Sequence, residues 1–464
     1  MRIGSLVIVL TLMLAGCSTA RPWLNAPLQP GEIVQYDGRR QIADSTRAGD
    51  ILVVASFSGG GSRAAAFAHA TLAEMDLHPF FWNGRRTTLA QEVDMVAGVS
   101  GGSVAAAHIA LHGITAHLQR FPAEFLQVDF QGKLLGAALS PSKLYQMTSR
   151  WQGRGHMLAD AFDAQLFHGT TFGQLAEMAG RPYLIVGATD LSNGSEFDFA
   201  SDQFSSLCSS IDYVPLSFAV ASSSSVPLLF SPLTLQNHSD SCPAPPGAPQ
   251  RIASPTARAQ LVQSEADSLA QPGRRYLHLV DGAVSDNLGL RRIADYVAQA
   301  GGIRAVLQLL QVDATQPEAI PRRIVFLSVN SERQAPSALE ESDDVPGAVA
   351  VLGALVQGNL GRHSRETEFV FNEAIDQWRA ELQVGGADVD VYLIEVNLSD
   401  LADAALRDRV LAIPTAFRIS DADRESLVLA ARESLTDSRE FRRFMQSVAV
   451  GTTSSGAVDV EPPY

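Results

Sequence analysis

The sequence predicts an α/β protein in which a mostly parallel central sheet is flanked by helices. Residues 51–55 form a short apolar run that ends in a glycine-rich turn at residues 58–61, and an alanine-rich helical pattern follows at residues 64–76. The same order of apolar run, glycine turn and alanine-rich pattern recurs at residues 93–96, 98–102 and 104–111. Two such units in succession are typical of a parallel sheet with helices on its faces.

Later apolar runs continue the pattern and are expected to be strands, with helical patterns after most of them: residues 183–188, 276–280, 324–329 and 391–396. We therefore expect one large domain over residues 50–450 and a loose tail at 451–464. Residues 120–175, rich in aromatic residues and glycine, show no clean period and are a candidate cap over a site. Residues 236–275 are rich in Pro, Ser, Ala and Gln and are interpreted as a surface insertion, because a strand follows them.

The N-terminus begins with one basic residue and a short apolar stretch. Arg2 is followed by apolar residues 6–14, and Leu14-Ala15-Gly16 then precedes Cys17. This order resembles a bacterial lipoprotein signal. An apolar stretch this short fits a cleaved export signal rather than a permanent membrane span. The resemblance implies a signal peptide at residues 1–16, acylation of Cys17 and a lipidated tether at residues 17–49. Ser18 favours the outer membrane, facing the periplasm. The alternative is an ordinary signal in which Cys17 is incidental.

The charge of the chain excludes one class of partner and constrains another. The formal net charge is -15, which argues against a nucleic-acid backbone as the main partner. A basic patch is therefore not expected to hold the protein at a membrane, whereas several acyl chains on one cysteine suffice. Two charge-free stretches, residues 95–119 and 213–239, are rich in Gly, Ser, His or Pro and are interpreted as core and loop rather than as membrane helices.

Export also bears on Cys208 and Cys242. Both would lie in an oxidising compartment, where one disulfide can form. Two unpaired thiols are the alternative, because sequence does not give the geometry of a pair.

The run Gly98-Val99-Ser100-Gly101-Gly102 fits the nucleophile elbow pattern GxSxG. Small residues around the serine permit a strained turn between strand and helix that presents its hydroxyl. The alternative is a tight glycine turn with a capping serine. The position after an apolar strand and before a helix favours the elbow.

The first glycine turn, Ser58 to Arg63, opens a helix whose free backbone N–H groups form an anion site. Acyl transfer needs such donors, because negative charge develops on the carbonyl oxygen. A nucleotide-binding loop is the competing interpretation. It is disfavoured because GxxxxGK[ST] is absent and the glycines are consecutive rather than spaced as GxGxxG.

A third element, Asp281-Gly282-Ala283, follows the run at 276–280 directly. A carboxylate at the end of a strand is well placed to accept a proton, although Asp-Gly turns are common.

The three elements, in this order, resemble the patatin-like phospholipase family. The resemblance spans roughly residues 51–435 and includes the serine-rich stretch at 221–232 and Pro414-Thr415-Ala416-Phe417. It implies Ser100 as nucleophile, Asp281 as its base, and an oxyanion turn and elbow that comprise Gly59, Gly60, Gly61, Ser62, Arg63, Gly98, Gly101 and Gly102. Arg63 would give supporting electrostatics. Ser58, Ala64 and Ala283 depart from the family pattern in small ways that concern fine geometry.

The resemblance implies a lipid acyl hydrolase that needs no metal and no cofactor, with membrane lipid or another acyl ester as substrate. Asp281 would take the proton of Ser100, and water would later release the acyl group. An ordinary aspartate is a poor base near neutral pH, so we expect Asp281 to be buried. The sequence indicates neither the head group nor an oligomeric state.

Three alternatives remain at this stage. In a Ser-Asp-His hydrolase the histidine follows the acid, and only His363 does so, in a hydrophilic run where an exposed structural role is expected. Four histidines on helical patterns favour a metal only weakly, because no carboxylate partner is evident: His69, His108, His112 and His117. A non-catalytic scaffold lipoprotein that retains the fold is the third.

Overall fold

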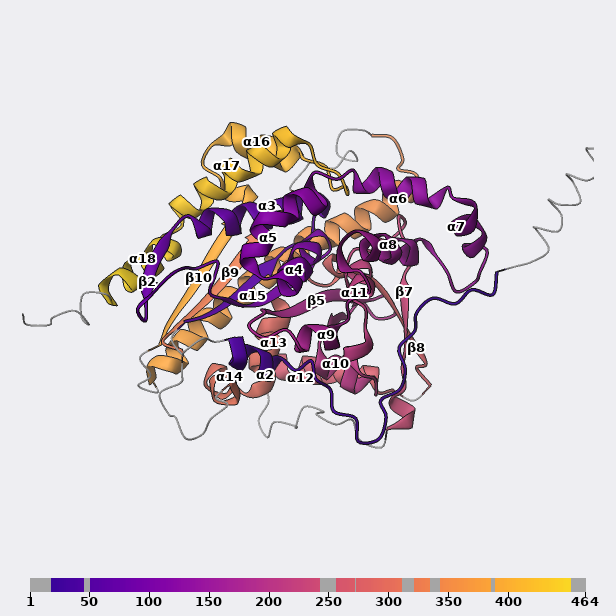
Figure 1. Ribbon diagram of the computed structural model, residues 1–464, viewed down its shortest axis with the longest axis horizontal. Coiled ribbons are helices and arrows are strands. Elements are labelled where there is room, and N and C mark those ends of the chain that lie inside the picture. Colours follow the sequence, from indigo (N-terminus) through magenta and orange to yellow (C-terminus); the bar gives the residue numbers. More distant parts are fainter. Residues whose placement is uncertain are drawn as a thin grey trace, which may run out of the picture.

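The computed structural model describes residues 18–45, 51–242, 256–271, 273–310, 321–333, 343–384 and 389–451. The predicted signal peptide, the predicted lipidation site Cys17 and all but the first residue of the predicted tail lie outside the described residues. Figure 1 shows a twisted sheet with helices on both faces.

The central sheet has eight strands in the order β10-β9-β1-β4-β5-β8-β7, and β6 also pairs with β5. The parallel part consists of β10 (Asp390–Asn397), β9 (Arg323–Asn330), β1 (Ile51–Phe57), β4 (Val93–Val99) and β5 (Tyr183–Asp190). The antiparallel part consists of β6 (Glu196–Phe199), β8 (Tyr276–Asp281) and β7 (Leu233–Gln236). The α/β fold and all six predicted strands are confirmed. The sequence did not predict β6, β7 or the separate hairpin of β2 (Pro79–Trp82) and β3 (Arg85–Thr88).

The helices cover both faces of the sheet (Figure 1). One side carries α3 (Gly61–Asp76), α4 (Gly101–His112), α5 (Ile114–Phe121), α11 (Leu216–Ser223), α16 (Ala404–Ala412) and α17 (Asp421–Asp437). The other side carries α2 (Gly38–Ser45), α12 (Ala257–Leu269), α13 (Arg291–Ala300) and α14 (Ile303–Leu310). The long α15 (Ala348–Val384) and α18 (Arg439–Gly451) pack beside β10.

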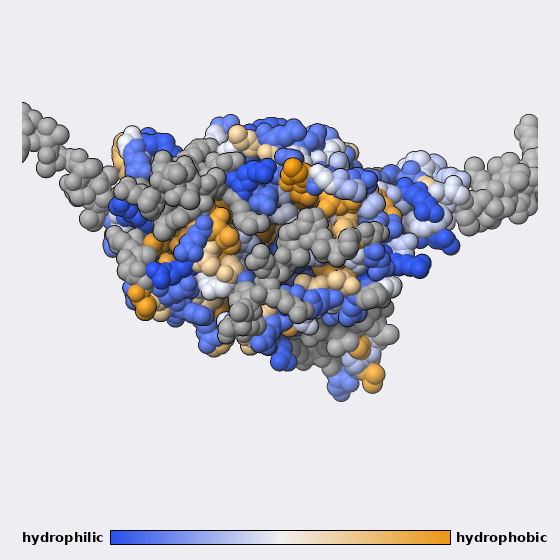
Figure 2. All heavy atoms as spheres, turned by 90° about the horizontal axis from the view of Figure 1, so that it is seen from below, coloured by the Kyte–Doolittle hydropathy of each residue, from blue (hydrophilic) through white to orange (hydrophobic). Residues whose placement is uncertain are grey.

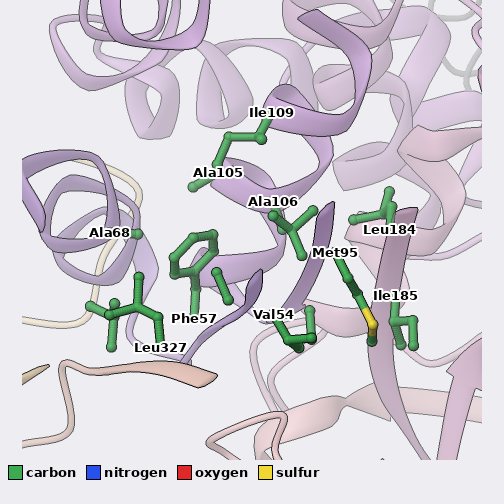
Figure 3. Close-up of a cluster of buried hydrophobic side chains, with 14 of the residues drawn as sticks. Val54, Phe57, Ala68, Met95, Ala105, Ala106, Ile109, Leu184, Ile185 and Leu327 are labelled. Atoms are coloured by element: carbon green, nitrogen blue, oxygen red, sulfur yellow. The ribbon is translucent and has the colours of Figure 1, made fainter. Parts of the chain in front are cut away.

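Alanine-rich sequences let α3 and α4 approach the sheet closely. Ala68 of α3 and Ala105 of α4 are fully buried, and Figure 3 shows them facing Phe57 and Leu327 on the strands. Small side chains lose little conformational entropy on burial and leave room for the larger strand residues. This packing holds the N-termini of both helices at the ends of β1 and β4, where the two glycine turns lie.

Residues 120–175 are mainly helical, although no clean helical period is visible in their sequence. They form a π-helical turn η1 (Pro122–Leu126), α6 (Phe130–Ala138), α7 (Pro141–Gln146), α8 (Arg154–Phe162), a second π-helical turn η2 (Asp163–Phe167) and α9 (Phe172–Ala176). All of these elements except α7 bury residues against the domain. Stacked and tilted phenylalanine rings join several of them: Phe121, Phe125, Phe130 and Phe162. A further short helix, α10 (Ser201–Ser206), follows β6.

The N-terminal segment from Ser18 onward lies against the domain. Tyr36 is fully buried, and its hydroxyl donates to the carbonyl of Leu184 and accepts from the Leu184 N–H. Further along, the Leu28 N–H donates to the carbonyl of Cys208. Cys208 forms a disulfide with Cys242, with Cα atoms 6.0 Å apart, so the pair left open by the sequence is joined.

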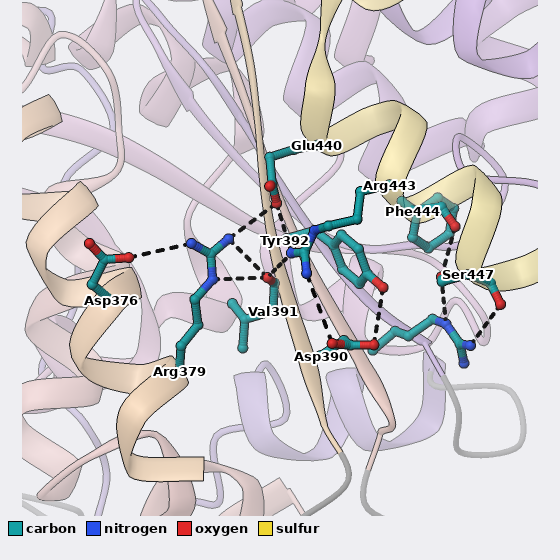
Figure 4. Close-up of polar contacts among 10 residues, drawn as sticks. Asp376, Arg379, Asp390, Val391, Tyr392, Glu440, Arg443, Phe444 and Ser447 are labelled. Atoms are coloured by element: carbon teal, nitrogen blue, oxygen red, sulfur yellow. Dashed lines mark hydrogen bonds and ion pairs between the residues drawn. The ribbon is translucent and has the colours of Figure 1, made fainter. Parts of the chain in front are cut away.

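The C-terminal helices protect the edge of the sheet at β10. Arg379 of α15 and Arg443 of α18 both donate to the carbonyl of Val391, and both contact Glu440 (Figure 4). Unpaired backbone groups on an edge strand are a hazard for aggregation, and this network occupies one of them.

Among the described residues, no helix is long and apolar enough to cross a membrane. This holds for the helices within the two charge-free stretches, residues 95–119 and 213–239. The face in Figure 2 is mainly hydrophilic, with apolar residues in separate areas.

Candidate active site

Ser100 lies at a strained turn between β4 and α4. Its φ of 51° and ψ of -123° are unusual for a residue with a side chain, and this strain is the hallmark of a nucleophile elbow. A side chain at Gly101 would overlap the carbonyl oxygen of Gly61, and one at Gly102 would overlap that of Phe57. Gly98 is likewise pressed against the backbone of Gly102. The glycines around the serine are therefore required by close approach of the two turns.

Asp281 lies at the end of β8 and reaches the nucleophile across the sheet. The Ser100 Oγ donates to the Asp281 Oδ2 at 2.8 Å. The other carboxylate oxygen accepts from the Ala283 N–H at 2.9 Å. Gly282 backs onto the carbonyl of Gly187 in β5, where no side chain would fit. The tight turn after β8 thus aims the aspartate at Ser100.

Burial makes this aspartate a far better base than a free one. The side chain of Asp281 is 3% exposed, as the argument from its chemistry required. Burial raises its pKa to about 7, while the Ala283 N–H and the Ser100 hydroxyl oppose the rise by stabilising the charged form. A base with a pKa near 7 can take and return a proton at neutral pH.

The first glycine turn presents two free backbone donors beside Ser100. Gly59 donates its N–H to Asn287, and Ser62 donates its N–H to the carbonyl of Ala416 at 2.7 Å. Within the part of the chain that the structure describes, the N–H groups of Gly60, Gly61 and Gly101 have no hydrogen-bond acceptor. Gly60 has a φ of 142°, a conformation open only to glycine. These three N–H groups are therefore candidates for the oxyanion donors expected from the sequence.

Arg63 is buried behind this turn and anchors it. Its Nε donates to the carbonyl of Ser331 at 2.9 Å, and its Nη1 donates to that of Ile413 at 2.6 Å. Burial first, and then the nearby Arg333, lower its pKa to about 10, so it is still a cation at neutral pH. These two hydrogen bonds join the first glycine turn to the loops after β9 and α16.

Two supporting residues were not singled out from the sequence. The Ser223 Oγ accepts the N–H of Ser100 at 2.8 Å, and Asn287 holds Gly59 through both its carbonyl and its side chain. Ser223 lies in the serine-rich stretch at 221–232, and Asn287 lies six residues after Asp281. Their partners lie more than 120 residues away in sequence, so only the fold brings them together.

The histidine rival is not supported by the geometry. Among the described residues, no histidine hydrogen bonds to Ser100 or Asp281. His363 lies in α15, and its Nδ1 is 3.2 Å from the carbonyl oxygen of Val284. It is half-buried, which corrects the expectation of an exposed histidine, because α15 packs over the turn that follows Asp281.

The four histidines noted on helical patterns lie together, away from Ser100, and the carboxylate of Glu124 lies beside His108. The His108 Nε2 is 3.0 Å from the Glu124 Oε2, so the expectation of no carboxylate partner was wrong. The signal was missed because Glu124 lies in a π-helical turn after α5, and a helical wheel drawn on α4 alone does not include it. Ligand atoms of His108, His112 and Glu124 all lie within 4.8 Å of one another.

A family model described as patatin-like phospholipase matches residues 55–293, which contain both glycine turns, Ser100 and Asp281. The chain belongs to the patatin-like phospholipase family. The matched range is shorter than the 51–435 expected from the motifs, and β9 and β10 lie beyond it.

Solved structures of low identity were also found, and none of the curated proteins that were searched matches this chain. Human GIVD cytosolic phospholipase A2 is 11% identical, with a TM-score of 0.42, over 91% of this chain and 69% of that chain. The same human enzyme in complex with methyl gamma-linolenyl fluorophosphonate is 10% identical, with a TM-score of 0.38, over 90% of this chain and 63% of that chain.

Proposed function

We propose that this patatin-like protein is a membrane-anchored serine lipid acyl hydrolase that cleaves acyl esters through a dyad of Ser100 and Asp281. The observation that carries the proposal is the 2.8 Å hydrogen bond between the Ser100 hydroxyl and a buried carboxylate whose pKa is raised to about 7. Phospholipid or another lipid ester is the proposed substrate, in keeping with the family.

In the first step Asp281 accepts the hydroxyl proton while the Ser100 Oγ forms a bond to the carbonyl carbon of the ester. The oxyanion that develops would accept hydrogen bonds from the N–H groups of Gly60, Gly61 and Gly101. Collapse of the tetrahedral species breaks the ester bond, and the alkoxide leaving group takes the proton from Asp281.

In the second step water attacks the acyl-serine and Asp281 takes a proton from it. The carboxylic acid departs, and the proton returns to Ser100. One carboxyl group therefore acts alternately as base and acid, which requires a pKa near the working pH.

The anchor is the least direct part of the proposal and rests on Cys17. Acylation there would hold the enzyme on the periplasmic side of a bacterial outer membrane, where lipid esters are at high local concentration. Incorporation of labelled palmitate into the wild-type protein, and its loss in Cys17→Ser, would support this anchor. Equal labelling of the two proteins would contradict it.

Release of fatty acid from phospholipid vesicles tests the proposed reaction. The processed wild-type protein is expected to release fatty acid, and Ser100→Ala to lower the rate by about 10³-fold or more, since loss of the nucleophile leaves only the contribution of the oxyanion donors. Ser192→Ala is the control, because Ser192 is exposed and its hydroxyl contacts neither Ser100 nor Asp281. A folded wild-type protein that releases no acid from any ester would indicate the non-catalytic scaffold instead.

A further inference from the structure

An exposed apolar surface lies on the outer side of α6 and α7. On α6, Phe130 and Leu134 are buried, whereas Leu135 and Leu139 are 59% and 75% exposed. None of the residues of α7 is buried. We call this area the α6–α7 surface; its exposed apolar residues are Leu135, Leu139, Leu144, Tyr145 and Met147. Such a patch on a soluble domain needs a partner, because isolated exposed leucines are common but clusters are not.

The charge around this surface is opposite to that of the whole chain. Residues 129–160 contain four basic residues, Lys133, Lys143, Arg150 and Arg154, and two acidic ones, Asp129 and Asp160, so this stretch has a net charge of +2 in a chain with a net charge of -15. Lys143 pairs with Asp160. Exposed apolar residues with flanking Lys and Arg are typical of segments that lie in the interface of an anionic bilayer.

The N-terminal chain meets the protein at the same place. The Ser18 N–H donates to the Thr148 Oγ at 3.0 Å, and the Ser149 Oγ donates to the carbonyl of Ala20 at 2.8 Å. The Arg21 guanidinium lies 4.2 Å from the centre of the Trp151 ring. In Figure 1 the indigo N-terminal segment passes beside α7. Residues 18–21 are therefore docked at the end of α7.

Because residues 18–21 are docked, the described segment after Cys17 is not a long free tether. Cys17 directly precedes Ser18, and consecutive Cα atoms are about 3.8 Å apart. An acyl chain on Cys17 would therefore enter the bilayer beside α7 rather than at the end of a long flexible linker. We propose that the α6–α7 surface lies on the bilayer and inserts its leucines among anionic lipids. This inference rests on the proposed function, because it takes lipid as the substrate.

The buried side of α6 connects this surface to the candidate active site. The Phe130 ring packs against that of Phe417, and the Gln131 N–H donates to the Phe417 carbonyl at 3.2 Å. The neighbouring Ala416 carbonyl accepts the N–H of Ser62 in the oxyanion turn. A bilayer on the outer side of α6 would thus be separated by this one helix from the loop that supports the oxyanion turn.

Sedimentation with vesicles tests the surface by itself when the full mature chain carries Cys17→Ser. This variant lacks the acyl chain. We expect binding to phosphatidylglycerol vesicles, weaker binding to phosphatidylcholine, and a decrease with added salt. Leu135→Gln with Leu139→Gln should weaken binding roughly 10-fold or more. The matched control is Leu77→Gln with Leu429→Gln, since both leucines are exposed elsewhere, and it should bind as the parent does.

Turnover of a water-soluble ester separates failure of this inference from failure of the proposed function. The α6–α7 double variant should keep that turnover, which also shows that it is folded. Unchanged vesicle binding by the double variant, or no binding by the parent, would overturn the membrane surface even if turnover is intact. Absence of ester turnover in every protein would contradict the proposed function and leave the binding result as it stands.

The histidine cluster carries a second inference independently. His108 and His112 lie one turn apart at the end of α4, and Glu124 reaches them from η1. Two histidines at i and i+4 with a carboxylate form a typical three-ligand set for Zn²⁺, with a fourth position open. The C-terminal end of a helix also favours a cation. We infer that His108, His112 and Glu124 bind a divalent transition metal ion such as Zn²⁺.

The surroundings of His108 suit this role. Its Nδ1 lies 3.1 Å from the Nδ1 of His117, whose Nε2 lies 3.4 Å from the Nδ1 of His69. If a metal takes the Nε2 of His108, the proton moves to Nδ1 and His117 accepts it, so the cluster supplies the outer hydrogen bond that orients a metal-binding imidazole. Arg120 contacts Glu124 at 2.7 Å and lies 3.4 Å from the His112 Nδ1, so it competes with the ion.

Competition for Zn²⁺ against a chelating dye tests this site on untagged protein. We expect one tight site in the wild type, a loss of at least about 10-fold in affinity for His112→Ala, and a gain for Arg120→Ala. His278→Ala is the control, because that histidine is exposed and lies outside the cluster. No binding by the wild type, or equal affinity of wild type and His112→Ala, would overturn the metal site.

Discussion

The hydroxyl of Ser100 and the carboxylate of Asp281 are joined by a 2.8 Å hydrogen bond across 181 residues of sequence. Both side chains are almost fully buried, and the second oxygen of Asp281 is held by the Ala283 N–H. Within the described chain, proton transfer from Ser100 can therefore go directly to the carboxylate.

The rate of ester hydrolysis should depend on pH through Asp281. Its pKa is raised to about 7, and only the ionised form accepts a proton, so kcat/KM should rise about tenfold per pH unit below pH 7 and level off above it. A profile of kcat/KM from pH 5 to 9 on a soluble ester checks this. A flat profile down to pH 5 would show that the base has an ordinary carboxyl pKa.

The burial of Asp281 should also lower the free energy of unfolding of the protein at neutral pH. Its pKa of about 7 in the folded protein lies above the ordinary aspartate value of 3.8, so this destabilisation is absent below pH 4, grows as pH rises and is complete above pH 7. Asp281→Asn should therefore raise the free energy of unfolding at pH 8 by up to about 4 kcal/mol while abolishing turnover. Urea unfolding at pH 8 and pH 5 measures the difference. A variant that is less stable than wild type at pH 8 would contradict the account.

The buried histidines should destabilise the protein in acid. Burial lowers the pKa of His69 from 6.5 to about 4, so its neutral form supports full stability above pH 6.5, and stability is lost as pH falls toward 4. His69 should contribute a loss of about 2 kcal/mol in the free energy of unfolding at pH 5. His69→Gln should narrow the gap between the unfolding free energies at pH 8 and pH 5. An unchanged gap would show that His69 titrates normally.

Arg292 is expected to be essential for folding stability. It is 5% exposed, contacts Asp202, and lies 3.6 Å from the Oδ2 of Asp198, whose pKa burial raises to about 7. Arg292→Met should lower the free energy of unfolding by about 3–5 kcal/mol, because it leaves the buried Asp198 without its cation. Adding Asp198→Asn and Asp202→Asn should recover much of this loss. If the triple variant is no more stable than the single one, the loss is one of packing rather than charge.

The disulfide should stabilise the domain and its docked N-terminal segment. It closes a loop with a sequence separation of 34, and Leu28 hydrogen bonds to Cys208. Replacing both cysteines by alanine should lower the free energy of unfolding by roughly 2–4 kcal/mol under oxidising conditions. Thermal unfolding with and without reductant checks this, since reductant should shift wild type only. A similar shift in the double variant would place the effect elsewhere.

The sequence predicts the parallel part of the fold well because its strands are buried on both faces. Such strands are continuous apolar runs, as in residues 51–55 and 324–329, and each is followed by a helix. The antiparallel part is less readable. The strand β6 is only four residues long and alternates acidic and aromatic residues, so its four-residue pattern does not stand out from a loop.

The candidate site divides in the same way. Ser100, Asp281 and the glycine turns lie in short local motifs and can be predicted from them. Contacts made by Ser223, Asn287 and Ala416 depend on the fold, because each joins segments far apart in sequence. Glu124 is only 16 residues from His108, but it was missed because it lies in the π-helical turn η1 after α5, which the helical pattern of α4 does not include.

Fluorophosphonate labelling of the purified mature protein, with the adduct mapped by mass spectrometry, tests the central claim most directly. We expect one adduct at Ser100, its absence in Ser100→Ala and a sharp decrease in Asp281→Asn, because only a serine activated by the buried carboxylate reacts quickly. An adduct on another serine, or no adduct on well-folded wild-type protein, would contradict the assignment of Ser100 and Asp281 as the catalytic pair.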